Sequence, residues 1–155
     1  LDETAGQALA NELGGDVHFA KCDLRDIDAL KSAIASLREQ IGPITVLVNN
    51  AARDDRHDWR EVTEEYWNER AATNIRHQFF AIQACAPDMI EQGGGSIINM
   101  GSVSWMMPQG NFPAYTTSKA AVHDEAKFID FTRSTLFFVE EAELISREPG
   151  VAYNP

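Results

Sequence analysis

The feature that most constrains the fold is a strong helical period followed directly by a short apolar run. Between positions 27 and 41, apolar side chains recur at steps of three and four residues, namely Ile27, Leu30, Ile34, Leu37 and Ile41. This spacing predicts an amphipathic helix, and Gly42 with Pro43 provides its end. Residues 44–48 are almost uninterruptedly apolar and β-branched, which is typical of a strand buried on both faces of a parallel sheet.

The rest of the chain repeats this alternation of helix and strand. We predict helices at 4–13 and from Thr63 to about residue 91, and strands at 17–22 and 96–100. Strand and helix at this spacing are typical of right-handed crossovers, so the sequence predicts an α/β protein with an open parallel sheet. Ligands of such sheets bind beyond the carboxyl ends of the strands, which here are the segments after residues 22, 48 and 100.

Length, charge and cysteine content narrow the class of protein. The 155 residues suit one domain, and 13 Lys and Arg against 24 Asp and Glu give a formal charge of −11. This charge repels phosphate backbones and anionic lipids, so we expect neither nucleic acid nor a membrane as a partner. No apolar run approaches the roughly 20 residues of a membrane span. Cys22 and Cys85 are too few for a disulfide framework, so we expect reduced thiols and a cytoplasmic protein.

Polar residues with a recognisable spacing follow the predicted strands. Tyr115 and Lys119 lie four residues apart and would share one face of a helix, although such a pair also occurs on many ordinary surface helices. Ser102 lies thirteen residues before Tyr115, Asn74 lies in the preceding helix, and the turn at 49–52 reads Asn-Asn-Ala-Ala. Together these residues resemble the short-chain dehydrogenase/reductase family, and the resemblance covers about residues 1–122.

The resemblance implies a fold and a set of site residues. The fold would be a Rossmann-like doubly wound parallel sheet, and the cofactor would be NAD or NADP. The catalytic residues would be Asn74, Ser102, Tyr115 and Lys119. The cofactor-binding residues would be Asp23, Leu24, Asn50, Ala51, Ala52, Tyr115 and Lys119. Ala52 replaces the glycine that usually ends the family's Asn-Asn-Ala-Gly turn.

The implied chemistry is transfer of a hydride from an alcohol to nicotinamide. A tyrosine has a pKa of about 10, so it needs a neighbouring cation to serve as a base near neutral pH, and Lys119 would be that cation. Tyr115 would take the alcohol proton, and the Ser102 hydroxyl would orient the same oxygen. Asn74 would hold a water in the proton path, and Lys119 would also bind the ribose hydroxyls.

The charged run at 53–58 bears on the substrate. Such a run is usually a solvated loop. Here the pattern Asn-Asn-Ala-Ala-x-Asp-Asp-Arg-His, with Asn-x-Arg-His-x-Phe-Phe from Asn74, looks like the bacterial aldose (xylose- or galactose-type) 1-dehydrogenases of the family. A sugar oxidised at its anomeric carbon is therefore the favoured substrate. Four polar residues are candidate substrate contacts because of their positions in this pattern, namely Ser102, Ser104, Gln109 and His57.

Other interpretations stay open at this point. The chain could belong to a reductase of another alcohol or ketone, such as an oxo-acyl substrate, or be a non-catalytic remnant without cofactor binding. The Trp and Met residues at 105–107 fit a pocket wall and a packed core equally well. The four histidines lack the spacing of a coordinating pair, so we predict no metal site.

The pattern departs from the family at both ends of the chain. The family's first strand and glycine-rich phosphate-binding turn would precede Leu1, so we expect an incomplete domain, weakened cofactor binding and no basis for choosing between NAD and NADP. Residues 123–155 diverge from the family and form a tail of uncertain structure. We expect the full-length form to be a homo-oligomer, a dimer or tetramer, that uses the helices bearing Asn74 and Tyr115.

Overall fold

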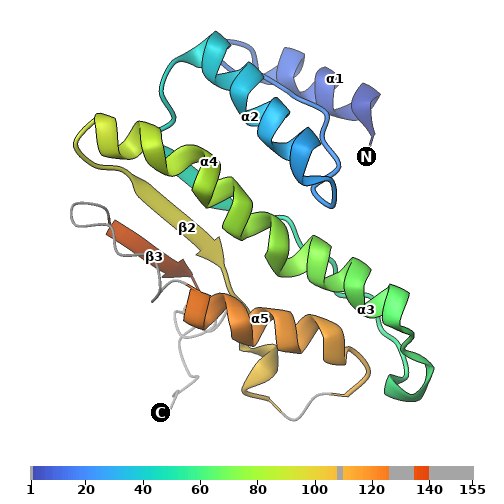
Figure 1. Ribbon diagram of the computed structural model, residues 1–155. Coiled ribbons are helices and arrows are strands. Elements are labelled where there is room, and N and C mark those ends of the chain that lie inside the picture. The colour runs from blue at the N-terminus through green and yellow to red at the C-terminus, as the bar shows by residue number, and fades with distance from the viewer. Residues whose placement is uncertain (1, 108–109, 126–134, 140–155) are drawn as a thin grey trace, which may run out of the picture.

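The structure is a computed structural model that describes residues 2–107, 110–125 and 135–139. Three parallel strands form one sheet in the order β1 (Val46–Asn49), β2 (Ser96–Met100) and β3 (Thr135–Val139). The helices are α1 (Glu3–Leu13), α2 (Ile27–Ile41), α3 (Glu64–Ala71), α4 (His77–Glu91) and α5 (Pro113–Glu125). Figure 1 shows α4 running alongside β2, with α5 close to the carboxyl end of that strand. The predicted α/β architecture with a parallel sheet is confirmed.

Local chemistry explains where the helices begin and end. The side chains of Asp2, Asp26 and Thr63 each accept a hydrogen bond from a backbone N–H in the first turn of α1, α2 and α3, as N-caps do. Gly14 and Gly42 follow α1 and α2 with φ of 64° and 84°, a backbone conformation that side chains with a Cβ rarely adopt. The predicted boundaries of these two helices are therefore confirmed.

The strand predicted at 17–22 is wrong. This segment is irregular, because no strand lies beside it in the described part of the chain and its backbone has no ladder to join. Side chains hold it instead. Phe19 packs closely over Gly6 of α1, where an added Cβ would lie 2.3 Å from the ring. His18 bonds Gln40 of α2 at 3.0 Å, and Lys21 bonds Glu3 at 3.0 Å.

The single helix predicted from Thr63 to about residue 91 is interrupted. A π-helical turn, Ala72–Arg76, joins α3 to α4. Such turns are most often single insertions in α-helices at functional sites. Asn74, a predicted catalytic residue, lies at the centre of this turn.

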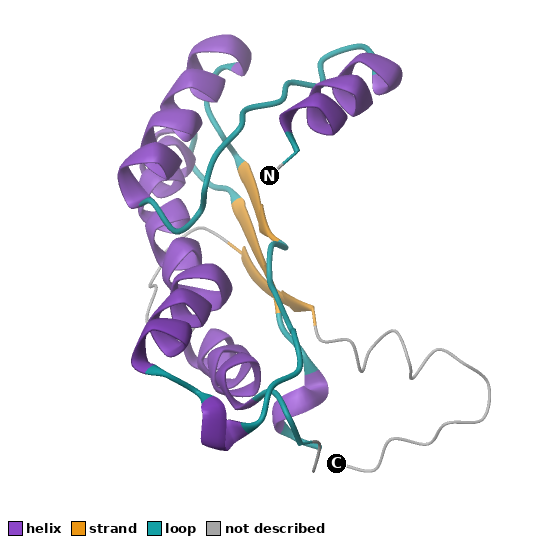
Figure 2. Ribbon diagram, turned by 90° about the vertical axis from the view of Figure 1, so that its right-hand side faces the viewer, coloured by secondary structure: helices purple, strands orange, loops and turns teal. Residues whose placement is uncertain are grey.

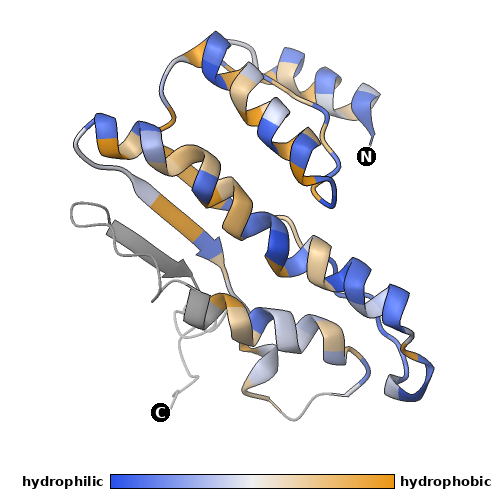
Figure 3. Cartoon of the chain, in the orientation of Figure 1, coloured by the Kyte–Doolittle hydropathy of each residue, from blue (hydrophilic) through white to orange (hydrophobic). Residues whose placement is uncertain are grey.

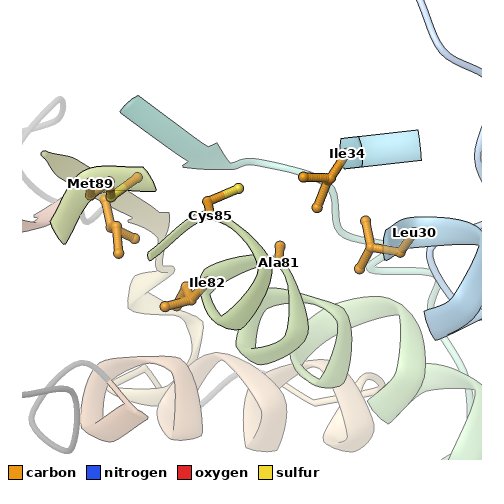
Figure 4. Close-up of a cluster of buried hydrophobic side chains, with 7 residues drawn as sticks. Leu30, Ile34, Ala81, Ile82, Cys85 and Met89 are labelled. Atoms are coloured by element: carbon orange, nitrogen blue, oxygen red, sulfur yellow. The ribbon is translucent and has the colours of Figure 1, made fainter. Parts of the chain in front are cut away.

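The hydrophobic core lies between α2, α4 and the sheet (Figure 4). Its buried members are Leu30, Ile34, Ala81, Ile82, Cys85, Met89 and Ile97. The hydropathy colouring agrees, because apolar residues run along α4 and β2 whereas α3 is mainly hydrophilic (Figure 3). Cys85 is a buried free thiol in this core, as its sequence context predicts.

The sheet is covered differently on its two faces. Figure 2 shows the helices that connect its strands stacked along one side of it. Val46 and Val48 point to the other side and are 57% and 52% exposed. The prediction that residues 44–48 are buried on both faces is therefore wrong, because no helix of the described residues covers these two side chains.

An ion pair fixes α2 against α4 and the entry to β1. The Arg38 side chain donates to the Asp88 carboxylate at 2.6 Å and to the Ala84 carbonyl at 2.7 Å. The same carboxylate accepts the Ile44 backbone N–H at 2.9 Å. These hydrogen bonds, from the backbone first and then from Arg38, hold the pKa of Asp88 below its usual value.

The predicted tail after residue 122 is described in part. Residues 136–139, which suit a strand or a helical face, lie in β3, and α5 extends to Glu125. The rest of the predicted tail, 126–134 and 140–155, lies outside the described residues. Within the described ranges, no helix combines the length and the apolar character needed to cross a bilayer.

Candidate active site

Tyr115 and Lys119 meet at the carboxyl end of β2. Both residues lie on α5, which passes this end of the sheet (Figure 1). The Lys119 ammonium donates to the carbonyl oxygen of Met100, the last residue of β2, at 2.5 Å. It lies 5.7 Å from the centre of the Tyr115 ring, and only 2% of Lys119 is exposed. The structure thus brings a buried cation beside the phenol ring, as the four-residue spacing predicts.

Ser102 follows the same strand and is paired with Ser104. Its hydroxyl accepts the Ser104 N–H at 3.2 Å and donates to the Ser104 hydroxyl at 3.0 Å, which starts the short 3-10 turn Val103–Trp105. Both serines are buried. Ser104 also lines a pocket formed with Trp105, Met107, Thr116, Thr117 and Ala120. Trp105 and Met107 therefore line a pocket and are not part of the core, whereas Met106 lies in neither.

Asn74 joins the π-helical turn to the loop after β1. Its side-chain oxygen accepts the Arg53 N–H at 2.7 Å, and its side-chain nitrogen donates to the Arg53 carbonyl at 3.0 Å. Its own carbonyl accepts from Gln78 at 3.1 Å. Asn74 is fully buried, so its amide fixes the position of this loop. Its role in a proton path stays a prediction.

The residues predicted to bind the cofactor lie in two places, after β1 and in the irregular segment before α2. Asn50, Ala51 and Ala52 are exposed immediately after β1. Asp23 and Leu24 line a second pocket with Arg25, Arg53, Glu69 and Thr73. Hydrogen bonds from Arg25 lower the pKa of Asp23 to about 2. Arg25 also pairs with Glu69 at 2.9 Å, so the pocket rim is a chain of alternating charges.

Of the remaining predicted substrate contacts, the structure describes His57 but not Gln109. The half-buried His57 ring contacts the Tyr66 ring in a tilted arrangement, with 4.5 Å between the ring centres. Its Nδ1 is hydrogen-bonded, and its Nε2 is buried with no partner among the described residues. A contact of His57 with the substrate stays a prediction. Gln109 lies outside the described residues.

The comparisons with known proteins identify the family. The family model described as short chain dehydrogenase matches residues 2–132, which is most of the chain. The chain belongs to the short-chain dehydrogenase family. The family match therefore extends past residue 122, where the sequence resemblance ends.

Several proteins similar to this chain carry names that bear on function. The chain is 44% identical over 116 residues to a probable galactose dehydrogenase of Rhizobium meliloti, covering 75% of this chain and 45% of the relative. It is 43% identical over 119 residues to a D-xylose 1-dehydrogenase of Caulobacter vibrioides, covering 75% and 46%. A metagenomic short-chain oxidoreductase solved with NADP matches with a TM-score of 0.80 and 26% identity, covering 90% of this chain and 66% of that one.

The chain spans slightly less than half the length of these two curated relatives. The sheet agrees with this family's fold, because the described strands are all parallel and are joined by helices. The predicted α/β Rossmann-like class is thereby confirmed for the part of the chain that is described.

The structure adds polar residues that sequence reasoning missed. Asn49 donates to the buried Asn99 side chain at 2.8 Å, which joins β1 to β2 at the end nearest the site. Burial lowers the pKa of His77, and the positive charge of Lys119 adds to this effect, so the ring is neutral at pH 7. The polar asparagine inside each apolar strand was the available signal for the Asn49–Asn99 pair.

Metal ligation has no support in the described ranges. No group of three or more His, Cys, Asp or Glu side chains there is arranged to hold an ion. The acidic side chains near the site are instead paired with arginines, as Asp23 is with Arg25 and Asp55 with Arg70.

Proposed function

We propose that the full-length protein carrying this chain is an NAD(P)-dependent aldose dehydrogenase. Its substrate is an aldose such as xylose, galactose, arabinose or fucose, which it oxidises at the anomeric carbon to a lactone. The observation that carries this proposal is the 43–44% identity to two relatives named for galactose and D-xylose. A serine, a tyrosine and a buried lysine around the end of β2 support the same reaction class.

The residues around the strand ends fit a dinucleotide. Ala51 and Ala52 have small side chains that leave the backbone after β1 accessible. The separate pocket at Asp23 and Leu24 is the proposed site for the base of the dinucleotide. The Lys119 ammonium, which the Met100 carbonyl holds at the end of β2, is the proposed partner of the ribose hydroxyls. When bound, the nicotinamide accepts the hydride that leaves the alcohol carbon.

The residues of the chain supply proton transfer and orientation. The Tyr115 phenolate takes the proton of the sugar hydroxyl. The Lys119 ammonium stabilises this phenolate, because it lies beside the ring in a site that excludes most water. The Ser102 hydroxyl turns from Ser104 to the substrate oxygen and holds the reacting carbon in place. Asn74 fixes the loop that borders the site through Arg53.

The test is a substrate panel with the full-length protein. Purified enzyme is assayed with NAD and with NADP against D-xylose, D-galactose, L-arabinose and fucose, and against keto-ester substrates in the reverse direction. We expect cofactor reduction with at least one aldose and formation of the matching lactone. Turnover of keto esters alone would reject the sugar and favour another short-chain reductase. Absence of nicotinamide fluorescence change at millimolar cofactor would instead indicate a non-catalytic remnant.

A further inference from the structure

The loop after β1 is braced by a network of four side chains. The Asp55 carboxylate accepts from Arg70 of α3 at 2.6 Å and from the Tyr66 hydroxyl at 3.2 Å. The Tyr66 oxygen lies 2.6 Å from Nδ1 of His57, and the same nitrogen lies 2.9 Å from the Asp55 carbonyl. Arg70 is only 3% exposed at its side chain. The charged run at 53–58 is therefore held in place through Asp55 and His57, while Arg53, Asp54 and Arg56 stay exposed.

One hydrogen arrangement satisfies all these contacts. The Tyr66 hydroxyl donates its single proton to the Asp55 carboxylate, and its oxygen then accepts the Nδ1–H of His57. Burial raises the pKa of Tyr66, and the negative charge of Asp55 adds to this, so the phenol keeps its proton. Burial also opposes the ionised form of Asp55, but Arg70 and Arg53 outweigh it and lower the pKa of that carboxyl. The network is thus a neutral phenol between a carboxylate and an imidazole.

Loop 53–58 also contacts the residues that precede α5. The His57 backbone N–H donates to the Asn111 carbonyl at 2.6 Å. Asn111 has a φ of 74°, in the left-handed region that asparagine tolerates better than most residues. The Arg56 guanidinium lies 3.9 Å above the ring of Phe112, which is 2% exposed. Two independent contacts therefore tie this loop to consecutive residues of the segment 110–113.

Phe112 in turn touches the tyrosine of the site. The Phe112 and Tyr115 rings are 5.9 Å apart, and the Phe112 carbonyl accepts the Thr116 N–H at 3.1 Å in the first turn of α5. A shift of Phe112 would therefore move the phenol ring as well as the beginning of its helix.

We propose that Asp55, Tyr66 and His57 are positioning residues for Tyr115. They hold loop 53–58 against α3. The loop in turn contacts the segment 110–113, which fixes the position of the Tyr115 ring at the start of α5. The proposal rests on the proposed function, in which Tyr115 accepts the substrate proton. None of the three side chains touches the Tyr115 ring, so their effect is transmitted by the loop. A proton acceptor displaced by a fraction of an ångström loses its alignment with the substrate hydroxyl, which is costly for the rate.

The first test is backbone hydrogen exchange in the full-length protein. Tyr66→Phe removes the hydroxyl that joins Asp55 to His57 and keeps the ring. We expect exchange in a peptide spanning residues 110–119 to become about tenfold faster, and exchange in α2 to stay unchanged. Glu64→Gln is the matched control, because this exposed side chain lies on the same helix outside the network. Unchanged exchange at 110–119 with faster exchange at 53–58 would overturn the proposal.

The second test is kinetic and uses a conservative rescue. His57→Ala removes the Nδ1 donor, whereas His57→Asn offers an amide at a similar position. We expect kcat to fall about tenfold in Tyr66→Phe and His57→Ala, with the dissociation constant of the cofactor unchanged, and to recover at least partly in His57→Asn. An increase of KM alone, or equal losses in both His57 variants, would reject a positioning role. If Tyr66→Phe fails to fold, the two His57 variants carry both measurements.

The two proposals fail in different ways. The exchange experiment needs no substrate, so it tests the link from the network to α5 whatever alcohol the enzyme oxidises. If the wild type turns over another alcohol but no aldose, the sugar proposal fails and the kinetic comparison is made with that alcohol. If aldoses are oxidised but exchange and kcat are unaffected by the substitutions, the positioning proposal fails alone.

Discussion

A lysine enclosed as fully as Lys119 is uncommon, because burying an ammonium costs free energy unless the charge has partners. One partner is the Met100 carbonyl, which places the ammonium at the end of β2. The neighbouring phenol of Tyr115 is then the group that gains most from this charge when it ionises. The pair thus links the packing of α5 on the sheet to the proposed proton transfer.

Replacing Tyr115 with Phe tests the proton acceptor. The variant keeps the ring that contacts Phe112 and removes only the hydroxyl. In the full-length enzyme we expect turnover to fall by about 10²- to 10⁴-fold, the usual contribution of a positioned acid or base, with cofactor affinity nearly intact. Steady-state kinetics and a cofactor fluorescence titration measure the two quantities. Turnover close to that of the wild type would mean that another group moves the proton.

Replacing Lys119 with Met tests a different combination of effects. The ammonium is proposed to serve both the phenol and the ribose, so we expect both kcat and cofactor affinity to fall. The variant also leaves the Met100 carbonyl without this donor, which costs about 1–3 kcal/mol of stability for a buried group. Chemical unfolding of wild type and variant measures that cost. A cofactor dissociation constant equal to that of the wild type would contradict the ribose role.

Sequence reasoning reached some of these residues and not others for a physical reason. The spacing of Tyr115 and Lys119 within one helix is local, so it is readable from the sequence. Asp55 and Arg70 are separated by a turn and a helix, and the charges around Asp55 look like those of any solvated loop. Only the fold shows that Arg70 is buried and that His57 contacts Tyr66.

At the scale of elements, the amphipathic and capped helices and the apolar strands near 44–48 and at 96–100 were predictable, whereas the strand expected at 17–22 was wrong. α2 carries its period and its caps in its own sequence. A strand depends on a neighbour for its hydrogen bonds, and residues 17–22 have the alternation of a strand without such a neighbour in the described chain. The π-helical turn was not predictable either, because its extra residue is fixed by Asn74 reaching Arg53 and not by helix propensity.

The Arg38–Asp88 pair predicts how low pH affects the stability of the contacts between α2, α4 and the entry to β1. The pKa of Asp88 is depressed in the folded state, so the carboxylate contributes stability above its ordinary pKa of about 4 and loses this contribution as the pH falls below it. We expect Asp88→Asn to be less stable than the wild type at pH 7, and the difference to shrink between about pH 4 and pH 3. Urea unfolding at these pH values measures it.

The control for this experiment is Glu39→Gln, which changes an exposed carboxylate next to Arg38 in sequence. We expect it to leave the unfolding midpoint nearly unchanged at every pH, as surface charges usually do. A difference between Asp88→Asn and the wild type that is the same at pH 7 and pH 3 would show that packing, and not the charge of Asp88, holds these elements together.

At the scale of the whole molecule, apolar side chains remain exposed on the helical layer. Trp67 of α3 and Phe79 of α4 are 42% and 45% exposed, and Trp105 beyond β2 is 39% exposed. Exposed aromatic residues on neighbouring elements are enriched at interfaces between proteins. The homo-oligomer stays a prediction, and these side chains are where its contact surface can be tested.

Replacing Phe79 with Glu tests this assembly. We expect the full-length wild type to sediment as a dimer or tetramer and Phe79→Glu to sediment as a smaller species, because a charge at the centre of an apolar contact is not solvated there. Phe79→Leu is the matched control and should retain the wild-type assembly. A wild type that sediments as a monomer, or a Phe79→Glu variant of unchanged mass, would remove Phe79 from any interface.

The π-helical turn sets how this chain tolerates insertion and deletion. A helix advances by about 100° per residue, so the surplus residue at Ala72–Arg76 rotates α3 relative to α4. Because of that rotation, α4 faces the sheet while Arg70 of α3 faces Asp55. Excising one residue there would leave a regular and more uniform helix, yet it would swing Arg70 away from its carboxylate. The π-helical turn is irregular, yet it is the place in these helices where we expect the deletion of a residue to be tolerated least.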